Sequence, residues 1–388
     1  MNDGSVVPIG GTIGMVGGGQ LGRMFCSAAA RMGYRTVVFC GRPDEPAAQV
    51  ASDVVVAAVD DIDAAHAFAR RCDVVTFEFE NLPGPTVAAC SEITPTFPSD
   101  AVLRTAQSRH LEKSTFEDAG LPVTPHRAVY TAEDVRQFGE SFGWPVVLKT
   151  NRDGYDGRGQ IKLSGAEGLH ALEPSWFSSK DDGHGGPPLI VEPLIRFDDE
   201  RSVVVARSRS GEVRAFPTFR NQHRDHILEI TSLGYPAEEA DRSAEAIAEQ
   251  VAEKLDVVGL VCVEFFRVGE RVLINEIAPR PHNSGHVTME ACHTDQFTQH
   301  VRAVAGLPLG DPSLKVRAAA MINLLGQACH DERPPRPDVI AADPAIAFHW
   351  YGKAECRTNR KMGHLTACGD DVDQIIARLR KVRDRLEA

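Results

Sequence analysis

The segment LVCVEFFRVGERVLINEIAPRPHNSGH, residues 260–286, holds two apolar stretches that are each interrupted by one glutamate. Val257 to Arg267 and Arg271 to Ala278 predict two strands, and the short connection between them predicts a hairpin. Glu264 lies in the first strand and Glu276 in the second. Because an unpaired carboxylate is costly to bury, each of them needs a cation or hydrogen-bonding partners.

Two carboxylates on neighbouring strands predict a magnesium site, because Mg²⁺ takes oxygen ligands and shares them with nucleotide phosphates. The alternative is that the two glutamates pair with arginines such as Arg280. The polar run that follows, with Arg280, His282 and Asn283, predicts a group that holds an anion next to the metal. A purely structural histidine is the alternative there.

Near the N-terminus a strand, a glycine turn and a helix follow one another. Thr12 to Val16 predicts a short strand, Gly17, Gly19 and Gly22 match the pattern GxGxxG, and a helical stretch continues to Ala30. Backbone amides at such a helix start can hold a phosphate. We therefore expect a contact with a substrate phosphate or sugar, and glycines that serve only the tight turn are the alternative.

A nicotinamide site is disfavoured at this turn. It needs an acidic residue at the end of the second strand to bind the ribose, and that position is Cys40, followed by Gly41 and Arg42. Further buried strands are predicted at Arg35–Cys40, Asp53–Ala57 and Asp73–Phe77, with alanine-rich helices between them. This order is typical of a doubly wound parallel sheet, and we expect the α/β unit to end near residue 110.

A second hairpin is predicted from Pro145–Thr150 and Gln160–Leu163, after a helix over about 107–119. The loop between its strands is rich in glycine, with Lys149 before it and Arg158 inside it. Glycines let backbone amides approach phosphate oxygens, while the two cations supply a point charge and a bidentate donor. We interpret the loop as a phosphate-binding lid, and a solvated hairpin tip is the alternative. The sequence has no GxxxxGK[ST] motif, which excludes a P-loop enzyme.

Length and composition limit the number of domains and the class of protein. The 388 residues favour two or three domains, and 43% hydrophobic and 25% charged residues are typical of globular proteins. The net charge of -12 argues against a nucleic-acid partner. We expect a cytoplasmic protein without a membrane partner, because the sequence shows neither a signal peptide nor an apolar run of about 18 residues. The nine cysteines form no metal-binding pattern and are expected to be reduced.

In this order the elements resemble the ATP-grasp superfamily and, within it, the N5-carboxyaminoimidazole ribonucleotide synthetase family. The motifs are GGGQLGRM (17–24), FEFENL (77–82), GYDGRGQ (154–160), NEIAPRPHNSGH (275–286), and YGK with RKMGH (351–353 and 360–364). The resemblance implies an α/β and α+β fold: a parallel-sheet preATP-grasp domain at 1–110, a small lid domain at 111–195, and an α+β catalytic domain at 196–388 that ends in a closing subdomain.

The resemblance also implies site residues, matched position by position. The ATP contacts would be Arg109, Lys149, Gly154, Tyr155, Asp156, Gly157, Arg158, Gly159, Gln160, Glu192, Pro193, Leu194, Ile195, Glu200, His223, Asn275 and Glu276. In this set 192–195 would face adenine and Glu200 would bind the ribose. Mg²⁺ would bind Glu264 and Glu276. The substrate contacts would be Gln20, Glu80, Tyr155, Asp156, Arg158, Lys353 and Arg360.

The implied activity is that of a ligase of purine biosynthesis. Bicarbonate, held by Arg280, His282 and Asn283, would attack ATP to give ADP and carboxyphosphate. The carboxyl group, directly or as CO₂, would then pass to the amine of aminoimidazole ribonucleotide, with Asp156 as proton acceptor and Arg158 as a further catalytic residue. A lid over about 125–190 would exclude water. A homodimer is usual for such enzymes.

One position separates this family from its relatives. Many superfamily members carry asparagine two residues after the metal glutamate, where this chain has Ala278. The form NEIAPR disfavours peptide-forming ligases and biotin carboxylase. A formyl phosphate-forming transformylase, a dehydrogenase and a non-catalytic nucleotide-binding protein remain as alternatives, and Arg42 has no assigned role.

Overall fold

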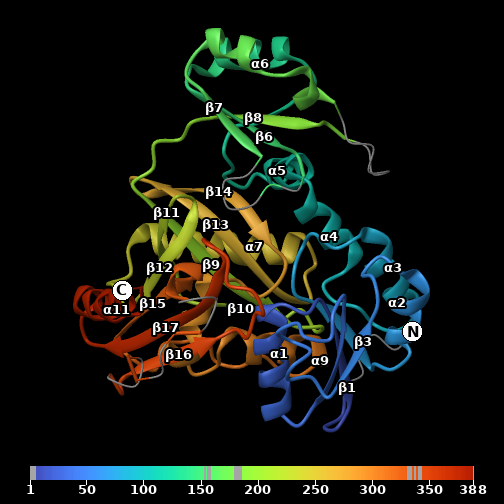
Figure 1. The fold of residues 1–388 in the computed structure, drawn as a ribbon. Helices are drawn as coiled ribbons and strands as arrows, with labels where there is room; N and C mark the ends of the chain where they lie inside the picture. The colour runs from blue at the N-terminus through green and yellow to red at the C-terminus, as the bar shows by residue number, and fades with distance from the viewer. Residues whose placement is uncertain are drawn as a thin grey trace.

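The computed structural model describes residues 6–152, 154, 159–178, 186–329, 334–335, 338–339 and 343–387. It contains three sheets, and Figure 1 shows one of them, with β6, β7 and β8, at the top and the other two below it. The predicted roles of Tyr155, Asp156, Gly157 and Arg158 lie outside the described residues. Within the described part of the chain, no helix is both long and apolar enough to cross a membrane.

The first sheet is parallel, with strand order β3-β2-β1-β4. Its strands are β1 (Thr12–Val16), β2 (Arg35–Cys40), β3 (Asp53–Val56) and β4 (Val74–Phe77), and its helices are α1 (Gln20–Arg31), α2 (Ile62–Ala69), α3 (Gly84–Ile93) and α4 (Asp100–Gln107). The predicted strands are present, but β3 is not buried. It lies at the sheet edge, and Val56 is 48% exposed.

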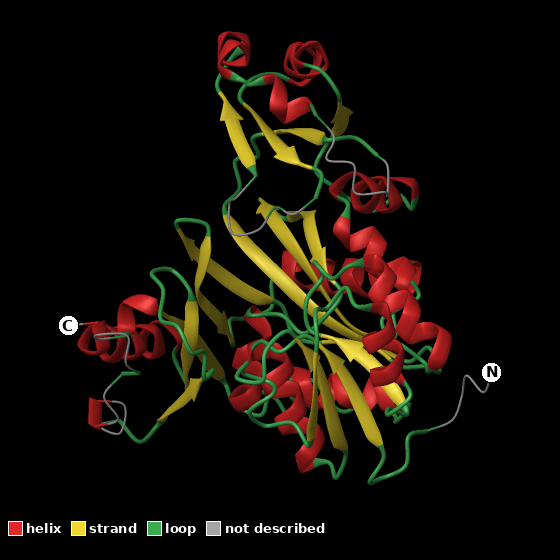
Figure 2. Ribbon diagram, turned by 45° about the vertical axis from the view of Figure 1, so that its right-hand side comes forward, coloured by secondary structure: helices red, strands yellow, loops and turns green. Residues whose placement is uncertain are grey.

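The lid sheet is antiparallel, with strand order β5-β8-β6-β7. It comprises β5 (Arg127–Val129), β6 (Val146–Thr150), β7 (Gln160–Leu163) and β8 (Leu189–Pro193), with α6 (Ala132–Phe142), η1 (Ala166–Ala171) and η2 (Pro174–Phe177). Both ribbon views (Figure 1, Figure 2) place this sheet at the top of the molecule. Lys149 on β6 pairs with Gln160 on β7, so the predicted hairpin is confirmed.

The approach to the lid differs in detail from the prediction. Instead of one helix over 107–119, α4 ends at Gln107 and α5 (Arg109–Asp118) begins two residues later. Ser108 separates them, because its hydroxyl accepts a hydrogen bond from the Leu111 amide and caps α5. This break places Arg109 at the first position of a new helix.

The third sheet is the largest and follows the order β14-β13-β9-β11-β12-β15-β17-β16, with β10 paired to β9. Its strands are β9 (Asp199–Arg207), β10 (Val213–Ala215), β11 (Phe219–Arg224), β12 (Ile227–Leu233), β13 (Gly259–Val268), β14 (Arg271–Ala278), β15 (Ala318–Leu325), β16 (Ile346–Trp350) and β17 (Lys361–Gly369). The strand order therefore connects the glutamate hairpin to the C-terminal strands in one sheet.

Helices cover this sheet as their apolar faces require. They are α7 (Glu239–Lys254), η3 (Ser284–Val287), α8 (Thr288–Ala291), α9 (Gln296–Ala305), η4 (Gly326–Ala328) and α11 (Val372–Glu387). The apolar stripe of α11 is buried against β15 and β17. Helix α9 packs on α1 of the first sheet, which ties the first domain to the catalytic one.

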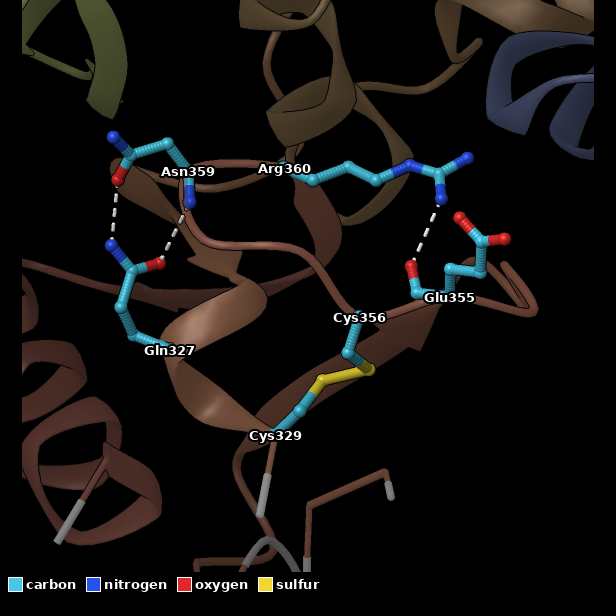
Figure 3. The surroundings of a disulfide bond; sticks show 6 residues. All are labelled: Gln327, Cys329, Glu355, Cys356, Asn359 and Arg360. Atoms are coloured by element: carbon cyan, nitrogen blue, oxygen red, sulfur yellow. Dashed lines mark hydrogen bonds between the residues drawn. A yellow bond between two sulfur atoms is a disulfide. The ribbon is translucent and has the colours of Figure 1, made fainter. Parts of the chain in front are cut away.

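The cysteines require a correction. Cys329, after η4, and Cys356, between β16 and β17, form a disulfide with Cα atoms 6.3 Å apart (Figure 3), whereas all nine cysteines were expected to be reduced. The other seven are free thiols. The pair was missed because 27 positions separate the two cysteines, and only packing of η4 against the 352–360 loop brings them together.

Candidate active site

Two neighbouring cavities open where the three sheets meet. The lid-side cavity, of about 740 Å³, lies between the lid sheet and the strands β9, β11, β13 and β14. The first-domain cavity, of about 460 Å³, lies between the ends of the first sheet and the loop after β14. The side chains that line both cavities are Arg109, Glu264, Glu276, His282, Asn283 and Lys361. These shared residues mark the place where molecules bound in the two cavities would meet.

The lid-side cavity gathers most of the residues expected to contact ATP. Those that line it are Arg109, Lys149, Gln160, Glu192, Pro193, Leu194, Ile195, Glu200, His223, Asn275 and Glu276. Gly154 lines the first-domain cavity instead. Gly159 closes the hairpin, and its carbonyl oxygen accepts a hydrogen bond from the Thr150 amide at 2.7 Å.

Glu264 and Glu276 lie directly opposite each other in the β13–β14 ladder, so both carboxylates are on one face of the sheet. Arg109 Nη1 donates to Glu276 Oε2 at 2.7 Å, and His282 Nε2 lies 3.0 Å from Glu264 Oε1. Burial alone would raise the pKa of Glu264, but the charged His282 lowers it to about 2. The arginine that pairs with the hairpin is therefore Arg109 and not Arg280.

The donor set at this pair fits a magnesium ion. Asn275 Oδ1, which precedes Glu276 on β14, is buried and has no hydrogen-bond partner among the described residues, and Asn275 lines the lid-side cavity. Within the described residues no group of three or more His, Cys, Asp or Glu side chains is arranged to hold a metal ion. Two carboxylates and an amide oxygen suit Mg²⁺, which completes its shell with water and phosphate oxygens.

Glu192 fixes the position of Lys149 at the edge of the lid. Lys149 Nζ donates to Glu192 Oε2 at 2.8 Å, and the fully buried Lys113 Nζ lies 3.2 Å from Oε1. Burial alone would raise the pKa of Glu192, but the two lysines lower it to about 2. Lys113 was not predicted. Its signal is the helical spacing of four from Arg109, which places both cations on one side of α5.

Glu200 and His223 face each other across the neighbouring strands β9 and β11. His223 Nδ1 lies 2.6 Å from Glu200 Oε2. Burial alone would lower the pKa of His223, but the hydrogen bond and the charge of Glu200 raise it above its ordinary value. The pair lines the lid-side cavity together with the segment 193–195, so this cavity has both polar groups and an apolar segment in its lining.

Glu80 and Arg280 connect the first domain to the end of the glutamate hairpin. Arg280 Nη2 donates to Glu80 Oε1 at 2.9 Å, and Nε donates to the other carboxylate oxygen. Gln107 Nε2 donates to the carbonyl oxygens of Glu80 and Leu82, both at 2.7 Å, and so fixes this loop. Arg280, expected to hold an anion, thus already has a carboxylate partner.

The glycine turn holds a carboxylate of the protein itself. The amides of Gly19 and Gly22 donate to the two oxygens of Glu78, at 2.7 Å for Gly22. A Cβ on Gly17 would lie 2.6 Å from Glu78 Cγ, and Gly17 has φ of +108°. The expected amide contact with a substrate phosphate or sugar is therefore not what these amides do here, because Glu78 occupies the helix start. Gln20, the next residue, does line the first-domain cavity.

His282 and Asn283 are fixed by neighbours on both sides. Burial alone would lower the pKa of His282, but the Cys262 sulfur and the Glu264 carboxylate raise it to about 10, so its ring carries a positive charge. Asn283 exchanges two hydrogen bonds with Asn323 on β15, at 3.2 and 2.9 Å. A cationic ring and an amide thus stand together where the two cavities meet.

Comparisons with known proteins agree with this geometry. Residues 11–107 match the ribonucleotide synthetase preATP-grasp domain, residues 114–297 the ATP-grasp domain, and residues 319–378 the phosphoribosylaminoimidazole carboxylase C-terminal domain. The N5-carboxyaminoimidazole ribonucleotide synthase of Brucella melitensis is 40% identical over 361 residues, which are 92% of this chain and 96% of the relative. The chain belongs to the N5-carboxyaminoimidazole ribonucleotide synthase family.

Solved structures of the family superpose along nearly the whole chain. The ADP complex of an N5-carboxyaminoimidazole ribonucleotide synthetase matches with a TM-score of 0.87 and 35% identity, over 99% of both chains. The Aspergillus clavatus synthase, in complex with ADP and 5-aminoimidazole ribonucleotide, matches with a TM-score of 0.87 and 27% identity, over 97% of this chain and 99% of that one. The chain is therefore an ATP-dependent ligase with the ATP-grasp fold.

Within this family fold, Lys361 lines both cavities, whereas the two cations expected on the substrate side, Lys353 and Arg360, line neither. Lys353 Nζ donates to the Lys361 carbonyl oxygen at 2.6 Å, so Lys353 lies next to a residue of both cavities. Burial, and then Arg360, lower the pKa of Lys353 to about 7, while Glu78 acts against them. Lys361 was missed because it lies at the start of a strand, where its direction cannot be inferred from the sequence.

Proposed function

We propose that the protein joins bicarbonate to 5-aminoimidazole ribonucleotide at the expense of ATP, giving N5-carboxyaminoimidazole ribonucleotide, ADP and phosphate. The observation that carries this proposal is the contact between the two cavities, which share the glutamate pair, His282 and Asn283. A nucleotide in one cavity and a ribonucleotide in the other would present their reacting groups to the same side chains. The relative that holds ADP and 5-aminoimidazole ribonucleotide together supports this arrangement.

ATP would bind in the lid-side cavity. The apolar segment 193–195 would flank adenine, and Glu200 would accept hydrogen bonds from the ribose hydroxyls. Lys149, held by Glu192 at 2.8 Å, would place its charge on the phosphates, and Arg109 at the start of α5 would lie on the same side. Mg²⁺ on Glu264 and Glu276, with Asn275 beside them, would neutralise charge on the β- and γ-phosphates.

Bicarbonate would bind beside His282, Asn283 and Arg280. Its oxygen would attack the γ-phosphorus, the bond to the β-phosphate oxygen would break, and ADP would leave with carboxyphosphate formed. The charged ring of His282 and the guanidinium of Arg280 lower the energy of the anion that develops there. A closed lid would exclude water from this short-lived intermediate.

The amine of the ribonucleotide would then attack the carboxyl carbon, and phosphate would leave, either in one step or after CO₂ is released. The nitrogen loses one proton in this step, and we propose Asp156 as its acceptor and Arg158 as a further catalytic cation. Gln20, Glu80 and Tyr155 would contact the ribonucleotide, while Lys353 and Arg360 would supply positive charge for its phosphate. We also propose the cytoplasmic location and the homodimer inferred from the sequence, the latter to be checked by sedimentation.

The experiment is ADP release measured with ATP, bicarbonate and 5-aminoimidazole ribonucleotide, with one component omitted at a time. We expect full rate only with all three, and the carboxylated ribonucleotide as product. ADP release that is no faster with the ribonucleotide present would overturn the proposal. Stimulation by formate instead of bicarbonate would identify a formyl phosphate-forming ligase.

A further inference from the structure

A cluster of buried rings lies directly behind the loop that carries His282. The ring of His364 on β17 stacks on His286 of η3, with centroids 4.9 Å apart, and on His349 of β16, at 4.5 Å. Tyr351 Oη lies 2.9 Å from His364 Nδ1. Tyr351, His286 and His364 are each at most 1% exposed. None of these rings lines either cavity, so they do not belong to the surface that a substrate would touch.

Gln296 connects this ring cluster to the catalytic loop and fixes the tautomer of His286. The side-chain Oε1 of Gln296 accepts from the His282 amide at 2.9 Å, and its Nε2 donates to the His282 carbonyl oxygen at 2.8 Å. The same Nε2 lies 3.1 Å from His286 Nδ1. Because an amide nitrogen only donates, Nδ1 of His286 is the acceptor and its proton is on Nε2. The Gln296 side chain thus joins the backbone of His282 to the ring of His286.

Tyr351 connects the ring cluster to the first domain and to Lys353. Its ring packs in the same core as Leu21 and Met24 of α1. Gln49 of the first domain donates to the carbonyl oxygen of Gly352 at 2.7 Å. Lys353 Nζ lies 5.6 Å from the centroid of the Tyr351 ring. The segment 351–353 is thus held between the first domain on one side and His364 on the other.

Neutral rings are required at this place. Arg280, His282, Lys361 and His349 surround His286, and burial together with these neighbours holds its pKa well below the ordinary value. Burial does the same for the pKa of His364. The Nε2 atoms of both rings are buried without a hydrogen-bond partner among the described residues, a cost that a core of aliphatic side chains would not carry. Stacked rings instead keep a defined direction and spacing, which aliphatic side chains do not.

We propose that Tyr351, His364 and His286 are positioning residues for the ribonucleotide, and that they fix the spacing between Lys353 and the loop that holds Arg280, His282 and Asn283. The phosphate end and the reacting end of one substrate would be held by these two segments. The ring cluster would set the distance between them while it touches neither end. This inference rests on the proposed binding of the ribonucleotide phosphate by Lys353.

The test is the steady-state kinetics of Tyr351→Phe and His364→Phe, which keep the rings and remove the hydrogen bond between them. We expect the KM for the ribonucleotide to rise about 5- to 10-fold, the size of one lost hydrogen bond. The KM for ATP should change less than about twofold, because the lid-side cavity is not involved. Tyr34→Phe is the matched control, since this buried tyrosine of the same core also loses one hydrogen bond, to the Val7 carbonyl oxygen.

Lys353→Met separates failure of this inference from failure of the proposed function. If the ring cluster acts through Lys353, Tyr351→Phe should have no further effect on the KM for the ribonucleotide in the Lys353→Met background. If Lys353→Met raises this KM but Tyr351→Phe does not, the positioning role is wrong and the proposed function stands. If Lys353→Met leaves it unchanged, the proposed phosphate contact is wrong. Thermal unfolding of each variant shows whether it is folded, and a destabilised Tyr351→Phe with an unchanged KM also overturns the inference.

Discussion

The two cavities of the active site are built in different ways. The lid-side cavity is formed by strands and a linker, and pairs of its polar residues lie on adjacent strands, as Lys149 does with Glu192 and His223 with Glu200. The first-domain cavity is formed where distant segments meet, and its central pair, Glu80 with Arg280, is separated by 200 positions. The difference teaches that the nucleotide side is carried by neighbouring strands of the lid and the catalytic sheet, joined by Arg109 to Glu276, whereas the substrate side needs the first domain placed against the end of the glutamate hairpin.

Charge balance separates the two sides as well. On the lid side each carboxylate already has a cation: Glu276 has Arg109, and Glu264 has the charged His282. On the first-domain side, burial raises the pKa of Glu78, although the Gly22 and Gly19 amides hold it, and lowers the pKa of Lys353. The pKa values of Glu78 and Lys353, near the proposed phosphate site, are therefore shifted toward neutral pH. Those of Glu264 and His282, at the proposed metal site, are shifted away from it.

The largest effect is expected from Glu276→Ala on the lid side. Removing Glu276 takes away one of the two carboxylates of the proposed metal site, and turnover should fall roughly a thousandfold, the scale of a lost charge-stabilising group. The protein should stay folded, because Arg109 keeps its hydrogen bond to the Gly154 carbonyl oxygen. The measurement is ADP release, together with circular dichroism.

Glu270→Ala is the control, since Glu270 is an exposed residue of the turn in the same hairpin. It should keep the rate of the unmodified protein. Activity retained in Glu276→Ala would contradict the metal assignment. The proposed difference between a nucleotide-binding lid-side cavity and a substrate-binding first-domain cavity would then lose its support.

Next in size is Glu80→Gln, which tests the side assembled from distant segments. Arg280 would keep a hydrogen bond but lose its charged partner, and kcat/KM for the ribonucleotide should fall about 30- to 100-fold. The KM for ATP should stay within about twofold if the two cavities act separately. Glu92→Gln, an exposed carboxylate of the same domain that pairs with His66, is the control. An equal loss in both substrates would show that the cavities are one functional unit.

The pH dependence of ribonucleotide binding gives the third prediction. With the pKa of Lys353 near 7, lowered by burial and Arg360, the free protein loses this charge as the pH rises. The phosphate prefers the charged amine, so the KM for the ribonucleotide should rise about tenfold between pH 7 and 8.5. The KM for ATP, measured in the same buffers, should not follow this curve. In Lys353→Met the KM for the ribonucleotide should no longer rise with pH. If it still rises, the pH dependence belongs to another group.

The same contrast explains how much the sequence could predict. The hairpin was predicted with one glutamate on each strand, because two apolar stretches and a short turn are local signals. That Glu264 and Glu276 face each other depends on a register shift after Glu264, which no sequence pattern showed. Lys361 was missed, because the start of a strand does not show where a charged side chain will point. Lys113 was missed although its spacing of four from Arg109 is a helical signal.

The glycine turn shows the other limit. Its pattern predicted a helix start that attracts negative charge, and this is what the structure has, but the charge comes from Glu78 and not from a ligand. The local motif shows only that the amides at this helix start attract an anion. The anion bound there is Glu78, which lies 56 positions from Gly22, and no local pattern contains that information.

The smallest effect on activity is expected from the disulfide, which lies at the outer edge of the substrate side. Cys329→Ser with Cys356→Ser, or reduction by dithiothreitol, should lower the free energy of unfolding by about 2–4 kcal/mol, because the cross-link restricts the unfolded chain. The KM for the ribonucleotide should change less than about threefold. Gln327 and Asn359 would still hold the loop through two hydrogen bonds, at 2.6 and 3.2 Å (Figure 3).

The control is Cys368→Ser, a free and partly buried thiol on β17, which should leave the response to reductant unchanged. Melting temperatures with and without dithiothreitol provide the stability measurement, and thiol titration of the denatured protein gives the number of free cysteines. A melting temperature that does not change with dithiothreitol would contradict the disulfide between Cys329 and Cys356. A large rise in KM on reduction would instead show that the loop before Arg360 depends on the cross-link, so that the substrate side would rely on a covalent bond where the lid side relies on ion pairs.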